Sequence, residues 1–139
     1  MAFADYKTAL VTGASGGMGW AIAERLGAKG LAVHALARNA EKLQELAAHC
    51  GAIPHVIDVS DTEAVSALVK DLEIDVLVNN AGVSRPGSIL TSSAFDIDEQ
   101  IDVNLRAALH LARLLLPGMM ERDRGHIVNI TSMAGHYEF

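Results

Sequence analysis

The sequence predicts an α/β protein in which helices cover both faces of a doubly wound parallel sheet. Apolar runs of strand length alternate with helical patterns along all 139 residues, and such alternation is typical of parallel strands joined by right-handed crossovers. Half of the residues are hydrophobic and only 4% are aromatic, a composition that suits short aliphatic strands under Ala- and Leu-rich helices. The sequence has no linker, repeat or low-complexity stretch, so we expect one domain over residues 1–139.

The first half of the sequence predicts three strands and three helices in alternation. Asn39 is a candidate N-cap, and Gly30 and Gly51 each stand where a helix-ending glycine is expected. Ser60-Asp-Thr-Glu63 has the pattern of a capping box, which predicts that the third helix starts there. The expected strands span residues 8–11, 31–37 and 53–58, and the expected helices span residues 20–29, 40–49 and 60–72.

The second half predicts two further strands and one long helix. We expect strands at residues 74–78 and 126–132, a loop at 83–93 and a helix over about 98–121. Pro54, near the start of the third strand, cannot donate to a sheet ladder and indicates an edge position. These observations predict the strand order 3-2-1-4-5.

Composition excludes several classes of protein. The formal net charge is −6 and there is no dense Lys/Arg run, so no nucleic-acid partner is expected. Cys50 is the only cysteine, which excludes an internal disulfide and fits a reducing compartment. The N-terminus has no signal or transit pattern and no stretch reaches 18 apolar residues, so we expect a soluble, cytoplasmic protein without a membrane segment. The six histidines lack metal-ligand spacing, so no metal site is expected.

A glycine-rich turn follows the first strand, as Thr12-Gly-Ala-Ser-Gly-Gly-Met-Gly19. A strand that turns tightly into a helix directs backbone N–H groups and the positive end of the helix toward one point. Glycines allow a pyrophosphate to approach the backbone closely. Because a strand precedes this turn and a helix and second strand follow it, we interpret it as the phosphate cradle of a Rossmann-like, dinucleotide-binding fold.

The end of the second strand bears on which dinucleotide would bind. An NAD-binding unit usually has an acidic residue here for the ribose 2′-OH, but Ala37 occupies that position and Arg38 follows it. A guanidinium can pair with the 2′-phosphate of NADP, so NADP is favoured and NAD stays possible; the alternative is a solvated arginine at a helix start. Asp58, at the end of the third strand, either accepts from an adenine amino group or serves as an acid near a helix N-terminus.

Five motifs in the same order resemble the classical short-chain dehydrogenase/reductase family. They are Thr12–Gly19, Asp58-Val59, Asn79-Asn-Ala-Gly82, Val103-Asn-Leu105 and Ile127-Val-Asn-Ile-Thr-Ser132. The resemblance runs from about Lys7 to the last residue. It implies an NAD(P)(H)-dependent oxidoreductase that acts on a small-molecule alcohol or carbonyl.

The resemblance also implies roles for particular residues. Ser132 matches the catalytic serine that steadies the substrate oxygen, and Asn104 matches the helix asparagine that holds a water in the proton relay. Without the resemblance, we would interpret Ser132 as a polar residue at the end of a strand and Asn104 as an ordinary amide on a helix surface. The residues that would contact the cofactor, besides Arg38, are Gly13, Ser15, Gly17, Met18, Gly19, Asp58, Val59, Asn80, Ala81, Gly82 and Thr131.

The sequence departs from the family pattern after Ser132. The family's general acid/base is the tyrosine of a Tyr-x-x-x-Lys pair, and Tyr137 is too close to Ser132 to match it and has no lysine four residues on. We therefore expect a longer parent protein, of which these 139 residues form the incomplete and inactive N-terminal part. An apolar fifth strand would be left as a bare edge. By family pattern, the apolar helix face over residues 101–116 predicts a homo-oligomer.

Two hypotheses of function remain. The first is an NADP-preferring oxidoreductase, supported by the five motifs. The second is a non-catalytic dinucleotide-binding or interaction module that has kept the cradle and lost the catalytic pair. Ser132 and Asn104 favour the first, because a mere binder has no use for them.

Overall fold

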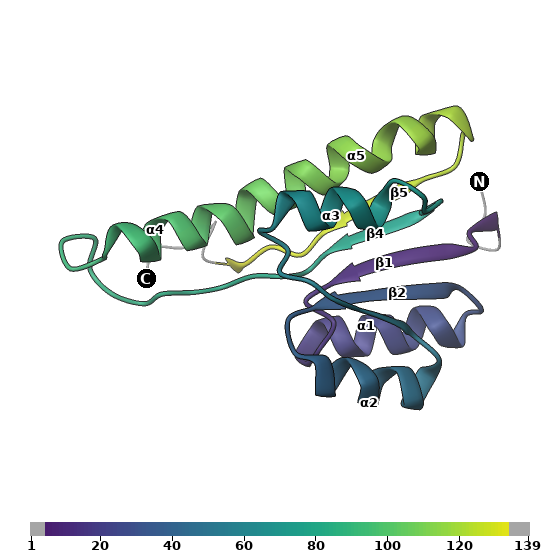
Figure 1. Cartoon of the computed structure of the whole chain (residues 1–139), viewed down its shortest axis with the longest axis horizontal. Coiled ribbons are helices and arrows are strands. Elements are labelled where there is room, and N and C mark those ends of the chain that lie inside the picture. The colour runs from purple at the N-terminus through teal and green to yellow at the C-terminus, as the bar shows by residue number, and fades with distance from the viewer. Residues whose placement is uncertain (1–4, 134–139) are drawn as a thin grey trace.

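A five-stranded, all-parallel sheet forms the centre of the protein (Figure 1). The computed structural model describes residues 5–133. The strand order is β3-β2-β1-β4-β5, so the predicted α/β class and strand order are confirmed, with β3 at an edge. The strands are β1 (Thr8–Thr12), β2 (Ala32–Ala37), β3 (Ile53–Val56), β4 (Val76–Asn79) and β5 (His126–Asn129).

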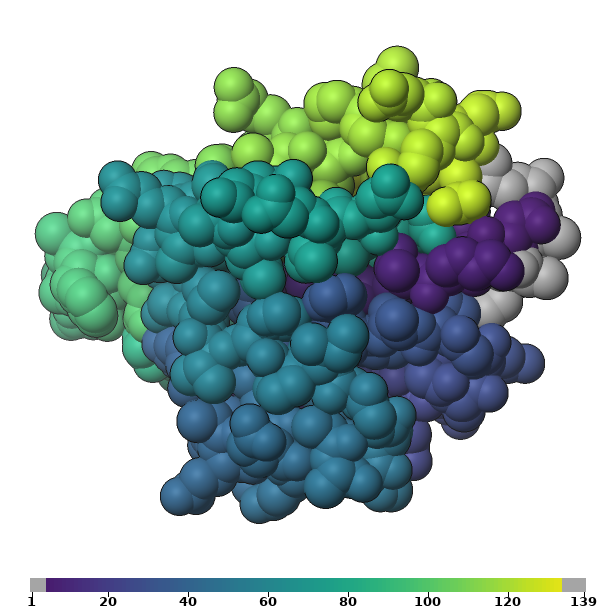
Figure 2. Space-filling model, turned by 45° about the vertical axis from the view of Figure 1, so that its right-hand side comes forward, coloured from purple at the N-terminus to yellow at the C-terminus, as the bar shows by residue number. Residues whose placement is uncertain are grey.

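Helices cover the two faces of this sheet in separate groups (Figure 1). The packing of buried side chains places α1 and α2 against one face and α3 and α5 against the other. In the space-filling view the teal side chains around α3 adjoin the green side chains of α5 (Figure 2). Ser66 of α3 and His110 of α5 are hydrogen-bonded to each other. The helices are α1 (Gly17–Ala28), α2 (Ala40–Cys50), α3 (Thr62–Val69), α4 (Ala94–Ile101) and α5 (Ala107–Glu121), with a π-helical segment, η2 (Asp102–Arg106), between the last two.

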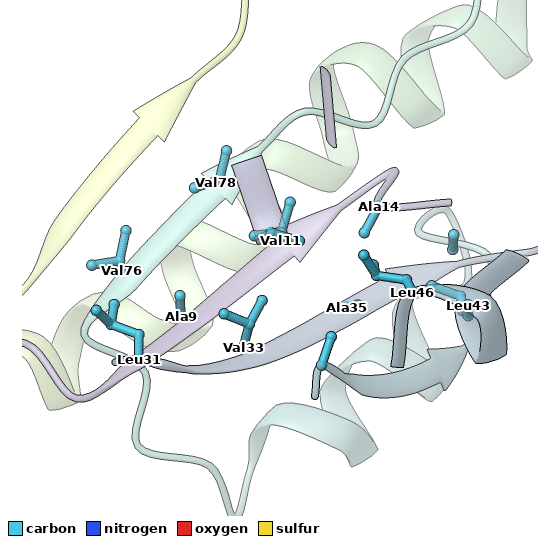
Figure 3. Packing of buried hydrophobic residues seen from close by; sticks show 13 residues of the cluster. Ala9, Val11, Ala14, Leu31, Val33, Ala35, Leu43, Leu46, Val76 and Val78 are labelled. Atoms are coloured by element: carbon cyan, nitrogen blue, oxygen red, sulfur yellow. The ribbon is translucent and has the colours of Figure 1, made fainter. Parts of the chain in front are cut away.

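Alternation along β1 divides the core between the two faces. Ala9 and Val11 point toward α1 and α2, whereas Leu10 points toward α3 and α5, and all three are fully buried. Figure 3 shows the first of these clusters, in which Leu43 and Leu46 of α2 pack on the sheet beside Ala35. A central strand buried on both faces explains why residues 8–11 are an unbroken run of residues without charge.

Several boundaries differ from the sequence prediction because local caps decide them. The Ser60 capping box is wrong: the Ser60 hydroxyl donates to Asp58, and Asp61 caps α3 by accepting from the backbone of Ala64. The long helix starts at Ala94 rather than near residue 98, because Ser93 and Asp96 form a reciprocal capping box. The helix predicted from residue 20 starts at Gly17, inside the glycine-rich turn.

The outer face of the long helix is apolar and exposed. Exposed apolar side chains along it include Ile101, Leu105, Leu109 and Leu116. These four belong to the helix face over residues 101–116 for which a homo-oligomer is predicted. Whether a second subunit covers this face stays a prediction. Within residues 5–133 no helix is both long and apolar enough to cross a membrane.

Asp75 joins the starts of three strands at the amino edge of the sheet. Its carboxylate accepts from the backbone N–H groups of Lys7 and Thr8 at 2.7 and 3.3 Å and from Nε of Arg124 at 2.9 Å. Its backbone oxygen accepts from the N–H of His126. Burial raises the pKa of Asp75, but the hydrogen bonds and the positive charge of Arg124 outweigh burial and hold this pKa below its ordinary value.

Asp75→Asn should lower the free energy of unfolding at pH 7 by roughly 1.5–3 kcal/mol, the usual value of a hydrogen bond to a charged group. Because the folded-state pKa of Asp75 is depressed, its stabilisation is complete above the unfolded pKa of about 3.9 and is lost as the pH falls through the folded pKa. Urea unfolding of both proteins from pH 7 to pH 3 measures this. Equal stability curves at every pH would contradict the assignment.

Candidate functional site

A cleft of about 430 Å³ opens at the carboxyl ends of β1 to β4. In an open α/β sheet this edge is where ligands bind. The cleft is lined by Gly13, Ser15, Gly16, Leu36, Ala37, Arg38, Asn39, Ile57, Asp58, Val59, Asn80, Ala81, Gly82, Val83 and Val103.

The glycine-rich turn forms one wall of the cleft and includes two kinds of glycine. A Cβ on Gly19 would collide with the carbonyl oxygen of Gly13 and would lie 2.5 Å from Nδ2 of Asn80, so this glycine permits close packing. A Cβ on Gly16 would meet nothing within 4 Å. The turn is therefore tight on its inner side and open on its outer side.

The open side of the turn suits a phosphate. Gly17 has a φ of +53°, a left-handed conformation that favours glycine. α1 begins at this residue, and the first N–H groups of a helix have no acceptor within the helix. These N–H groups and the positive end of the helix dipole provide an anion site, so the residues present fit the pyrophosphate of a dinucleotide.

Thr12 ties the turn to the next strand. Its hydroxyl accepts from the backbone N–H groups of Asn80 and Ala81, both at 3.0 Å, and the Thr12 side chain is buried. In return, Nδ2 of Asn80 donates to the carbonyl oxygens of Thr12 and Gly13 at 2.9 and 3.3 Å. Sequence reasoning placed Thr12 in the motif without a role, because a bond to residues 68 and 69 positions away leaves no local signal.

Arg38 and Asp58 both line the cleft and face one another across part of it. The distance from Nη1 of Arg38 to Oδ2 of Asp58 is 3.6 Å. The other carboxylate oxygen of Asp58 accepts from the N–H and the hydroxyl of Ser60 at 2.9 and 2.7 Å. Burial raises the pKa of Asp58, yet the Ser60 hydrogen bonds and the charge of Arg38 together lower it below its ordinary value. Asp58 is therefore ionised at neutral pH.

Asn104 lies in η2, beside the cleft rather than in its lining. Its side-chain amide is bonded twice to one residue: Oδ1 accepts from the N–H of Val83 and Nδ2 donates to the carbonyl of Val83, both at 2.8 Å. Val83 itself lines the cleft. The amide thus holds the segment after β4 in place, and π-helical turns of this kind often accompany functional sites.

The β5 side of the site is held by a pair of amides. Asn79 and Asn129 are register partners on β4 and β5, and Nδ2 of Asn79 donates to Oδ1 of Asn129 at 2.9 Å. Thr131 and Ser132 follow β5 at the same edge of the sheet and are exposed. They do not line the cleft described above.

The structure brings together most of the predicted cofactor residues. The cleft is lined by Gly13, Ser15, Arg38, Asp58, Val59, Asn80, Ala81 and Gly82. Gly17, Met18 and Gly19 lie in the adjoining first turn of α1 and Thr131 lies past β5, so these four are outside the lining. Sequence reasoning missed Leu36, Ile57 and Val103, which line the cleft but look like ordinary apolar core positions in the sequence.

Two further expectations concern Tyr137 and metal binding. Tyr137 falls outside the described residues. Among residues 5–133, no three His, Cys, Asp or Glu side chains are arranged to hold a metal ion.

Comparison with known proteins agrees with this fold. The profile of the short chain dehydrogenase family matches residues 7–139. A short-chain type dehydrogenase/reductase of Sinorhizobium fredii, y4eK, is 46% identical over 131 residues, which cover 94% of this chain and 53% of the relative. The chain spans about half the length of the curated relatives that it matches first. This protein chain belongs to the short-chain dehydrogenase/reductase family.

Solved structures of relatives share the fold closely. A metagenomic short-chain oxidoreductase in complex with NADP matches with a TM-score of 0.91 at 39% identity, over 96% of this chain and 65% of that one. A 3-oxoacyl-[acyl-carrier protein] reductase of Brucella melitensis with bound NAD matches with a TM-score of 0.90 at 32% identity, over 96% and 56%. These two relatives hold different dinucleotides in the same fold.

The two kinds of glycine predict different costs for one added methyl group. Gly19→Ala should lower the free energy of unfolding by about 1–3 kcal/mol, because the Gly13 carbonyl must shift. Gly16→Ala should leave stability within about 0.5 kcal/mol, since the backbone at Gly16 is extended and the space is open. Thermal unfolding of both variants tests this, and equal losses would show that the packing of the turn is not the cause.

Proposed function

We propose that the parent protein is an NADP-favouring oxidoreductase that transfers hydride between the nicotinamide and an alcohol or carbonyl substrate. The observation that carries this proposal is the cleft at the carboxyl ends of β1 to β4, with an open glycine turn on one side and Arg38 on the other. The nicotinamide of the bound cofactor would supply or accept the hydride. The residues of this chain would bind and orient it.

The binding roles follow from the chemistry of each wall. The first N–H groups of α1 would hold the pyrophosphate, and the open space at Gly16 would admit it. Arg38, whose side chain is 64% exposed, would reach a 2′-phosphate at the rim. Leu36 and Ile57 would lie against the adenine, and Asp58 would accept from its amino group.

The catalytic roles belong to the end of β5 and to η2. Ser132 would steady the substrate oxygen by a hydrogen bond, and the family resemblance supports this assignment. Asn104 already fixes Val83, and it would thereby hold the wall of the site near the proton relay. The 139 residues contain no Tyr-x-x-x-Lys pair after Ser132, so the proposal leaves proton transfer to a group outside them.

Arg38→Ala should weaken NADPH binding roughly tenfold or more, because a charge-assisted pair with the 2′-phosphate is lost. NADH binding should change little, since NADH carries a neutral hydroxyl at that position. Fluorescence titration of the full chain with each cofactor measures both affinities. Arg25→Ala, which removes the same charge from an exposed position near the end of α1, is the matched control. Equal losses for NADPH and NADH would contradict the assignment.

Ser132→Ala in the full-length natural protein should lower kcat for carbonyl reduction by about 10²–10³-fold, the usual cost of removing one donor to a reacting oxygen. NADPH affinity should stay unchanged, because the proposed bond is to substrate. Steady-state kinetics on a panel of small ketones and aldehydes, with parallel cofactor titration, provides the test. A full-length protein that binds NADPH but turns over none of the panel would favour the non-catalytic binding module instead.

A further inference from the structure

Asp58 places a fixed negative charge beside the cation that would recognise NADP. We propose that this carboxylate moderates the cofactor preference by partly neutralising Arg38 and repelling a 2′-phosphate, so that the cleft accepts NAD as well as NADP. The inference rests on the proposed cofactor-binding function of the cleft. It assigns Asp58 a role in specificity that is separate from any contact with adenine.

The carboxylate cannot easily move away from this position. Ser60 donates to Oδ1 of Asp58 through both its backbone N–H at 2.9 Å and its hydroxyl at 2.7 Å. These bonds hold the Asp58 side chain against the turn after β3. The other oxygen, Oδ2, is then the one that lies near Arg38. Both bonds also favour the ionised form of the carboxyl group. The negative charge is thus a fixed part of the cleft wall.

The contact between Asp58 and Arg38 acts through charge more than through orientation. The separation of 3.6 Å between Nη1 and Oδ2 exceeds the 2.7–3.2 Å of an ordinary N–H···O bond. Arg38 is also largely exposed, with 64% of its side chain accessible. A carboxylate at this distance does not clamp the guanidinium into one pose, so its main effect on an arriving phosphate is electrostatic.

The negative charge of Asp58 affects the binding of NADP and NAD differently. The 2′-phosphate of NADP is an anion that approaches Arg38, whereas the 2′-hydroxyl of NAD is neutral. Every other contact, including any bond from Asp58 to adenine, is common to both. The ratio of the two dissociation constants therefore isolates the effect at the 2′ position. In a solvent-exposed site, a unit charge a few ångströms from the phosphate changes the affinity for NADP by about three- to tenfold. The effect is smaller at high salt, because the charges are screened.

The experiment compares Asp58→Asn with Asp61→Asn. Asp61 lies three residues further on, is exposed and caps α3 by accepting from the N–H of Ala64 at 3.0 Å. Asparagine caps a helix as well as aspartate does, so this control removes the same charge without loss of the cap. NADPH and NADH are titrated into the full chain at low salt and again at about 0.15 M salt, where screening is stronger.

The expected result is a rise of about three- to tenfold in Kd(NADH)/Kd(NADPH) for Asp58→Asn at low salt, reduced at higher salt. Asp61→Asn should leave the ratio within about twofold, because Asp61 is exposed, lies outside the cleft lining and is not within ion-pair distance of Arg38. Asp58→Ser, which removes the charge with a smaller side chain, should move the ratio in the same direction as Asp58→Asn. Agreement of the two Asp58 variants would separate the effect of charge from any disturbance of the turn.

Two results would overturn the inference while the proposed function stands. An unchanged ratio would mean that Asp58 acts on adenine alone. A lowered ratio would mean that Asp58 orients Arg38 toward the phosphate rather than opposing it. If the unaltered protein binds neither cofactor, the proposed function itself fails, and the inference fails with it.

Discussion

The approach of α1 to the end of β1 is the constraint on which the rest of the site depends. Gly19 lies so close to the carbonyl of Gly13 and to Nδ2 of Asn80 that no side chain fits between them. This contact sets where the helix begins, and the start of the helix sets where its unpaired N–H groups point. The turn is compressed on its inner side, and on its outer side the space at Gly16 is open.

The two edges of the sheet are held by different chemistry. At the amino edge, the buried carboxylate of Asp75 gathers the starts of β1, β4 and β5 with help from Arg124. At the carboxyl edge, the hydroxyl of Thr12 and the amide of Asn80 join β1 to β4 through neutral hydrogen bonds. The buried carboxylate that joins strands is thus at the edge away from the cleft. The carboxyl edge keeps its positive charge at Arg38, where the only nearby carboxylate among the lining residues is that of Asp58.

Sequence reasoning succeeded where the signal is local and strong. Asn39 does cap α2 by accepting from the N–H of Lys42, and Gly30 and Gly51 do adopt positive φ after α1 and α2. It failed at the start of α3, where three neighbouring residues can all cap a helix. The hydroxyl of Ser60 is used by Asp58, so Asp61 takes the capping role two residues before Glu63. The hydrogen bond from Ser60 to Asp58 decides this competition, and the pattern of residues does not show it.

The sequence by itself determined the alternation of strands and helices, the strand order and the glycine turn, because burial of apolar residues and the conformational freedom of glycine act over a few residues. The family also followed from the order of its motifs. Only the tertiary structure decided that Asn104 holds Val83, that the helix around it is π-helical and that Asp58 stands 3.6 Å from Arg38. Asn104 and Val83 are 21 positions apart, and Arg38 and Asp58 are 20 positions apart. The distances between these residues depend on how strands and helices pack in three dimensions.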